Sequence, residues 1–277
     1  MDSSQIQKNF GAGFSSGTMT MMSVVLGVSL YFTVLAIQKA SGDITPEFFV
    51  KAFLVLMIIP GMFQMYHYMT ALVQNPPTFV TSLPLFLIGA SLAVAAASLE
   101  PVNSCPPCPS DENSCTREYL FYGAFVVFYL GCCLAFLLTR AIAIQTSYTV
   151  SGISDPGILI VRNSSLNCVL YAFLLLWSLL FLVLACIYDC KPLVYPYALL
   201  CIAVLYLAMV SVRMRLLDIF YKVLSPNAVL IPKNLSGGLS IWAINAISKM
   251  LLKLGNSKFV AGCCPRIALV LREAGSS

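Results

Sequence analysis

Few residues in this chain could do chemistry, and the densest polar group among the apolar stretches lies just before residue 71. It consists of Gln64, Tyr66, His67 and Thr70, and His67 is the only histidine in the sequence. A serine or cysteine nucleophile would have to use His67 as its base, and no acidic residue lies near it in sequence to orient the ring. We therefore interpret the group first as an imidazole that forms hydrogen bonds at a membrane boundary, and second as the lining of a pore or substrate site.

Metal or cofactor chemistry has little support in the sequence. Met62, Met65 and Met69 fall on one face of the same segment, and thioethers select Cu(I), but methionine is also a common filler of irregular packing gaps. The sequence contains no glycine loop for phosphate, no zincin helix and no pair of intramembrane aspartates. We predict no metal, no cofactor and no catalytic residue.

Four of the eleven cysteines fall in two polar segments: Cys105, Cys108, Cys115 and Cys190. Cys105 and Cys108 have the spacing of a redox pair, but that chemistry needs a thiol at a helix N-terminus or beside a cation, and these two lie in a proline-rich acidic segment. Four thiolates could also bind zinc. Structural disulfides are the first interpretation, and they require an oxidising compartment.

The elements that must position these residues follow from where the charges fall. Only 10% of the 277 residues are charged and 59% are apolar, whereas an average soluble domain has roughly a quarter charged residues. A charge at the bilayer centre costs at least ~2.5 kcal/mol, so long uncharged windows mark spans of about 20 residues. The windows predict an all-α polytopic membrane bundle of six transmembrane helices, at residues 19–38, 52–73, 79–99, 119–139, 166–188 and 193–212.

The basic residues predict how this bundle is oriented. Twelve Lys and Arg fall on the side that carries the two termini and four fall on the other side. A positive-inside bias of this size places both termini in the cytoplasm. The sequons at Asn163 and Asn234 then lie on the cytoplasmic side, so we expect neither to carry a sugar. Residues 1–212 form the membrane domain, and residues 213–277 form a basic cytoplasmic tail.

Small residues predict which helix lies at the centre of the bundle. Helices in lipid associate through close packing of small side chains. Gly89, Ala93 and Ala97 follow one another at four-residue spacing in the third span. We therefore expect residues 79–99 to form a central helix that packs through this stripe.

The tail carries an amphipathic helical pattern between residues 239 and 254. Its apolar face and its basic face are typical of a helix that lies in the headgroup plane. We predict attachment to anionic cytoplasmic lipid through Lys249, Lys253 and Lys258, with Cys263 and Cys264 as candidate palmitoylation sites. The alternative is that the helix caps the bundle and its lysines are solvated. Nucleic acid is not an expected partner, because the basic residues are thinly spread.

These observations favour a non-enzymatic membrane component that works by assembly, as an envelope, organising or accessory subunit in a homo- or hetero-oligomer. A channel or permease for neutral or apolar cargo is the alternative, and a membrane-embedded transferase that uses loop acids comes third. The cysteines place the protein on the secretory route, in the plasma membrane or in an envelope derived from it.

Overall fold

The computed structural model describes residues 2, 4–6, 8, 17–39, 45–72, 79–99, 112–150, 153–188, 194–224 and 238–276, in places by the backbone alone. The described part is helical throughout and contains no strand; an isolated parallel bridge pairs Asp2 with Thr149. The helices run as follows: α2 Gly17–Lys39, α3 Pro46–Leu72, α4 Phe79–Ala97, α5 Glu112–Gln145, α6 Pro156–Ile187, α7 Val194–Leu224, α8 Gly238–Gly255, α9 Lys258–Cys263 and α10 Pro265–Gly275. Each of the six predicted ranges therefore falls on one helix, to within two residues at its ends.

Three of the helices contain stretches long and apolar enough to cross a membrane: Arg117–Gln145, Pro156–Ile187 and Val194–Val212. The described apolar stretches of α2 and α4 are shorter, at Leu26–Lys39 and Leu83–Ala97. Among the described residues, three helices rather than six meet the length and composition needed for a span.

Helices α5 and α6 extend well beyond the spans predicted from the charge-free windows. The expected spans end at residue 139 and begin again at residue 166, whereas α5 continues to Gln145 and α6 begins at Pro156. Proline is well suited to the first turn of a helix because its missing N–H needs no partner there. Arg140 and Arg162 consequently lie on helices, because a charge near the end of a span does not interrupt backbone hydrogen bonding.

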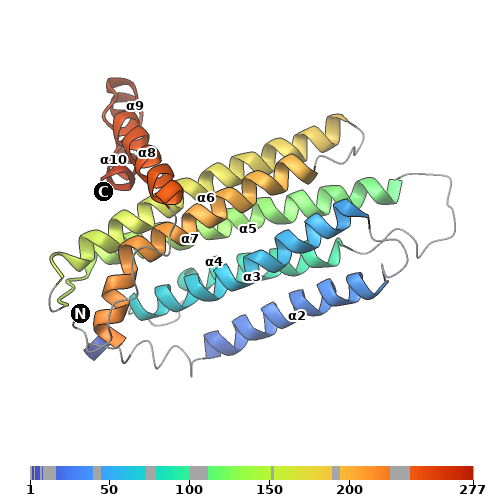
Figure 1. Ribbon diagram of the computed structural model, residues 1–277, viewed down its shortest axis with the longest axis horizontal. Helices are drawn as coiled ribbons and strands as arrows, with labels where there is room; N and C mark the ends of the chain where they lie inside the picture. The colour runs from blue at the N-terminus through green and yellow to red at the C-terminus, as the bar shows by residue number, and fades with distance from the viewer. Residues whose placement is uncertain are drawn as a thin grey trace.

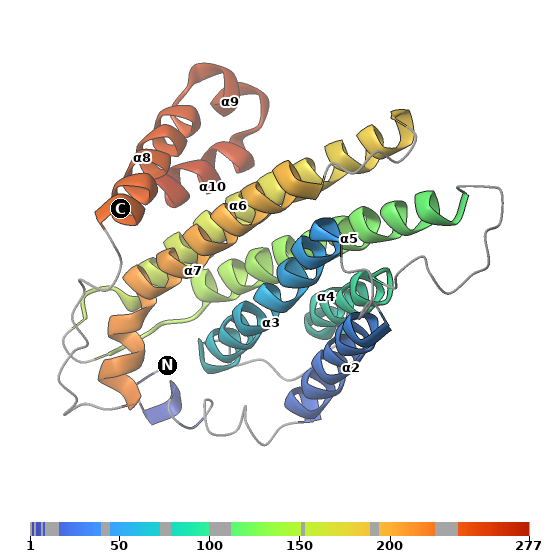
Figure 2. The ribbon, with the colours of Figure 1, turned by 45° about the vertical axis from the view of Figure 1, so that its right-hand side comes forward.

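The long helices pack side by side with α5 at their centre (Figure 1). Helices α4 and α6 lie against α5, α7 lies against α6, α3 contacts α7, and α2 contacts α4 (Figure 2). Helices α8 to α10 form a separate hairpin, in which α8 and α10 pack together and α10 lies against α6. This hairpin is set to one side of the bundle and runs across the direction of the long helices (Figure 1).

Aromatic side chains fill the space between α5, α6 and α7. Tyr122 and Tyr197 meet edge to face, with ring centroids 5.0 Å apart, and the Ser178 and Tyr197 hydroxyls are 2.9 Å apart. Large aromatic side chains exposed by less than 2% line this interior: Phe121, Tyr122, Phe125, Tyr129 and Tyr197. The outer faces of the same helices expose leucine and valine instead, which is the arrangement expected when lipid surrounds a bundle.

Helices α4 and α5 approach each other closely at Gly131. A Cβ on Gly131 would lie 2.8 Å from Cγ1 of Ile88 and 3.1 Å from the carbonyl oxygen of Pro84. The predicted small-residue stripe on α4 turns gradually away from the protein interior, since Gly89 is buried, Ala93 is half-buried and Ala97 is exposed. Gly131 of α5 permits the close approach at this point.

Candidate functional site

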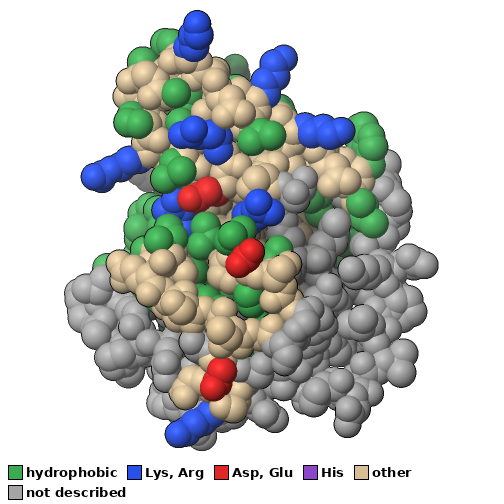
Figure 3. Space-filling model, turned by 90° about the vertical axis from the view of Figure 1, so that its left-hand side faces the viewer, with side chains coloured by type: hydrophobic (Ala, Val, Ile, Leu, Met, Phe, Trp, Pro, Cys, Tyr) green, Lys and Arg blue, Asp and Glu red, His purple; other side chains and the backbone are tan. Residues whose placement is uncertain are grey.

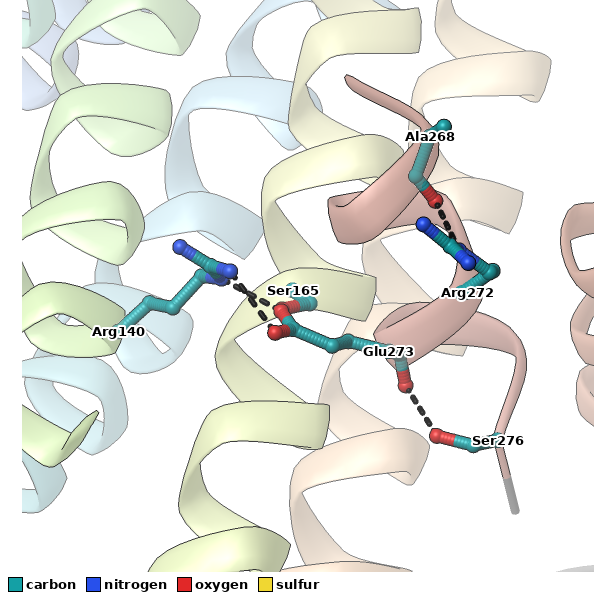
Figure 4. A network of polar contacts seen from close by, with 6 residues as sticks. All are labelled: Arg140, Ser165, Ala268, Arg272, Glu273 and Ser276. Atoms are coloured by element: carbon teal, nitrogen blue, oxygen red, sulfur yellow. Dashed lines mark hydrogen bonds and ion pairs between the residues drawn. The ribbon is translucent and has the colours of Figure 1, made fainter. Parts of the chain in front are cut away.

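A charged cluster fastens the C-terminal hairpin to the bundle of long helices (Figure 4). Arg140 of α5 donates two hydrogen bonds to Glu273 of α10, from Nε to Oε2 at 2.6 Å and from Nη2 to Oε1 at 2.8 Å. The Ser165 hydroxyl of α6 donates to the same Oε2 at 2.9 Å. The consecutive helices α5 and α6 thus meet the distant helix α10 at one carboxylate.

The geometry of this cluster makes it a strong and specific contact. The Arg140 and Glu273 side chains are only 15% and 21% exposed, so solvent screens their attraction weakly. A two-point arginine–carboxylate pair also fixes the relative orientation of its partners. We call Arg140, Ser165 and Glu273 the latch.

A second polar group lies beside the latch, where α6 faces α7. Asn167 donates to the backbone oxygen of Asn163 at 2.9 Å and to the Ser211 hydroxyl of α7 at 3.2 Å. Asn163, Ser164, Ser165 and Asn167 are all at most 2% exposed. The polar stretch of α6 is therefore interior and covered by neighbouring helices, and the sequon at Asn163 is inaccessible in the folded protein.

Close backbone contacts join α8 and α10 within the hairpin. A Cβ on Gly255 would lie 2.9 Å from the carbonyl oxygen of Ala268, and one on Gly275 would lie 2.5 Å from the backbone oxygen of Ser248 and the backbone nitrogen of Leu252. The apolar face of α8 is covered as a result, with Ile244 and Leu251 each 4% exposed. Part of the face expected from the sequence to contact lipid therefore packs within the protein, while Leu254 at its end is 44% exposed.

Replacing Gly275 by Val should open the hairpin at its end, because the new side chain would overlap the backbone of α8. Overpacking of this kind costs about 1 to 3 kcal/mol. The measurement is the rate of limited tryptic cleavage after Arg266 and Arg272, which should rise. Gly262→Val is the matched control, since a Cβ there would meet nothing within 4 Å; equal cleavage of the two variants would contradict the expectation.

The N-terminal residues lie at the same end of the bundle as the α5–α6 connection. Ile6 is 1% exposed and packs with Tyr148, Val212 and Ile219. Hydrogen bonds from the Gln5 N–H and the Ser4 hydroxyl lower the pKa of the Asp2 carboxyl. The start of the chain is thereby tied to the end of α5 and to the far part of α7.

The opposite region of α5 carries another ion pair. Lys51 of α3 contacts Glu118 of α5, and its ammonium lies 5.3 Å from the centre of the Phe121 ring. Both charged side chains are 15% exposed. This pair joins α3 to α5 as the latch joins α10 to α5.

The structure places the predicted site residues at several different positions. Helix α3 contains four of these residues, Gln64, Tyr66, His67 and Thr70, and their side chains lie outside the described part of the structure. Of the disulfide candidates, Cys115 lies near the start of α5, while Cys105, Cys108 and Cys190 fall outside the described residues. The cysteines whose side chains are described are free thiols: Cys132, Cys133, Cys168, Cys186, Cys201, Cys263 and Cys264. The predicted disulfides therefore stay predictions.

The predicted lipid-facing residues are all accessible on the hairpin. Lys249 and Lys253 are exposed on α8, Lys258 opens α9, and Cys263 and Cys264 are exposed where α9 meets α10. The described residues contain no group of three His, Cys, Asp or Glu side chains that could hold a metal ion.

The latch is the site that the sequence analysis did not predict. Its one clue was Glu273, which is the single acidic residue among the basic residues that follow Lys222.

Comparisons of the chain with protein families, with curated proteins and with solved structures found no match. The fold and the latch define a class of object, a helical bundle with membrane-compatible helices and a fastened C-terminal hairpin.

Proposed function

We propose that this chain is an integral membrane protein of six spans that works by assembly with itself or a partner, as an envelope, organising or accessory subunit rather than an enzyme. The latch is the observation that supports this proposal. Taking two charges out of water is costly, and their attraction offsets the cost only where the geometry is good. Such a pair is better suited to fixing where an element sits than to adding stability, and a hairpin held in a fixed place is what an assembly component needs.

The proposed six spans are α2 to α7. Each contains at least 19 residues, and about 20 residues cover the apolar thickness of a bilayer. An even number of crossings returns the chain to the side where it began, and the N-terminal residues and the α5–α6 connection indeed share one end of the bundle. We assign that end to the cytoplasm, where the positive-inside bias places both termini.

The proposed membrane is the plasma membrane, another membrane of the secretory route, or an envelope derived from it. In this orientation the segments that carry Cys105, Cys108, Cys115 and Cys190 face the oxidising side. The filled aromatic interior between α5, α6 and α7 favours a structural role for these helices over a pore along their axis.

Chemical cross-linking in intact membranes, followed by blue-native electrophoresis, tests the assembly. We expect species larger than the 30.1 kDa monomer, and fewer of them in the Glu273→Gln variant, which disturbs the hairpin. A monomer alone in intact membranes would contradict the proposal. Reconstituted liposomes that leak a neutral solute, with the leak abolished by Gln64→Ala or His67→Ala, would favour the channel instead.

A further inference from the structure

We propose that the exposed face of the hairpin binds the anionic headgroup layer of the membrane beside the bundle. The exposed side chains that we propose to make this contact, and which we call the platform, are Trp242, Lys249 and Lys253 of α8, Lys258 and Phe259 of α9, and Arg266 of α10. The proposal rests on the membrane orientation proposed above, and its ligand is a bilayer surface that contains acidic phospholipid.

The position of the hairpin supports this assignment. The latch joins α10 to Arg140, which directly follows the uncharged stretch between residues 119 and 139 of α5. The hairpin is thus attached at the expected boundary between apolar core and headgroups. It lies to one side of the long helices in both views (Figures 1 and 2). If those helices cross the bilayer, the hairpin lies beside the bundle at this boundary.

The charge of the hairpin complements an acidic surface. Residues 238–276 carry five basic side chains, at positions 249, 253, 258, 266 and 272, and one acidic side chain, Glu273. The latch pairs that carboxylate with Arg140 of the bundle. Residues 238–276 contain no other acidic side chain to offset their basic ones. Lys and Arg project from the hairpin in several directions (Figure 3).

Exposed aromatic side chains indicate a lipid layer rather than bulk water as the neighbour. Trp242 is 68% exposed and Phe259 is 79% exposed. On the helical repeat of α8, Trp242 shares a face with Lys249 and Lys253, opposite buried Ile244 and Leu251. Aromatic rings combined with basic residues are typical of elements that lie among headgroups.

The covered apolar stripe of α8 refines the type of contact expected from the sequence. An amphipathic helix that inserts its apolar face needs that face to be free, but in α8 the part of it that includes Ile244 and Leu251 is buried. The platform therefore contacts lipid through its basic and aromatic side, while the bundle and the latch hold it at the surface. Electrostatic attraction should dominate this contact, which makes it sensitive to lipid charge and salt.

The test uses the full chain in nanodiscs and Trp242 as the reporter. The sequence has two tryptophans, so Trp177→Phe leaves Trp242 as the single emitter. We expect its emission to shift to the blue, acrylamide quenching to fall and brominated-lipid quenching to rise when phosphatidylserine is added to phosphatidylcholine nanodiscs. Each basic residue near such a surface contributes roughly fivefold, so Lys249→Gln with Lys253→Gln should weaken the attraction about thirtyfold.

Lys8→Gln with Lys39→Gln is the matched control, because it removes the same charge away from the hairpin and should leave the quenching unchanged. Equal quenching of Trp242 in neutral and acidic nanodiscs would overturn the proposal. So would shielding that follows protein concentration rather than lipid charge, which would indicate a second copy on the platform. Extraction of the protein from membranes by alkaline carbonate is a separate readout, and it would instead contradict the proposed spans.

Discussion

Replacing Glu273 by Gln should release α10 from the bundle while the long helices remain folded. The substitution leaves the Arg140 guanidinium, 15% exposed, without its counter-charge. Removing one partner of a buried ion pair costs about 3 to 5 kcal/mol. The hairpin makes its other contacts mainly within itself and with α6. The lost free energy should therefore weaken the attachment of the hairpin to the bundle.

Hydrogen exchange of the α10 amides in the reconstituted protein measures this release. At about 3 kcal/mol, the open population and therefore the exchange of amides protected by docking should rise by roughly a hundredfold. The amides of α5 between residues 121 and 136 serve as the internal reference, because the aromatic interior holds them independently of the hairpin. Unchanged protection of α10 would show that the latch does not hold the hairpin.

Two further variants separate the charge of the latch from its shape. Ser165→Ala removes one neutral donor to the carboxylate and should cost only about 1 kcal/mol. Exchanging the charges, with Arg140→Glu and Glu273→Arg together, should recover part of the protection that either single change loses. Additive losses in the double variant would indicate that the two residues act separately.

The location of the helices could be predicted because it depends on a local property of the chain. A stretch of about 20 residues without charge can be recognised without knowing its neighbours, and each range predicted in this way falls on one helix to within two residues at its ends. The ends of the helices were harder to predict. Arg140 and Arg162 mark where apolar windows stop, but α5 and α6 continue past them because a charged side chain at the bundle end can reach water or a partner.

The latch could not be predicted because its partners are separated by 133 residues. Many basic residues could form an ion pair with Glu273. Neither composition nor periodicity indicates which of them does. The amphipathic pattern of α8 has the same limitation. Periodicity identifies Ile244 and Leu251 as one face, but it does not say whether lipid or α10 covers that face.

The polar residues 163–167 show why a sequence can mislead about burial. They follow Arg162 and precede a long apolar stretch, a position that suggests a loop meeting a span. In the folded protein, α7 supplies Ser211 to Asn167 and α10 supplies Glu273 to Ser165. Their burial is therefore a consequence of tertiary packing, which no local pattern contains.

Introducing side chains at Gly131 should separate α4 from α5 and destabilise the bundle more than any equivalent change on the same helix. A Cβ there would lie 3.2 Å from the backbone nitrogen of Ile88 as well as 2.8 Å from its Cγ1, so rotation of one side chain cannot relieve the whole contact. We expect about 1 kcal/mol for Gly131→Ala and about 3 kcal/mol for Gly131→Leu. Thermal unfolding in detergent micelles measures both.

Gly123 supplies the matched control, because it lies on the same helix and a Cβ there would meet nothing within 4 Å. Gly123→Ala should be neutral or slightly stabilising, since alanine favours a helix over glycine. Combining Gly131→Ala with Ile88→Ala should cost less than the sum of the two changes, because truncating Ile88 removes the side-chain part of the overlap. Strict additivity would mean that the backbone contact with Pro84 limits the approach of the two helices, and equal stability of the Gly131 and Gly123 variants would contradict the close packing itself.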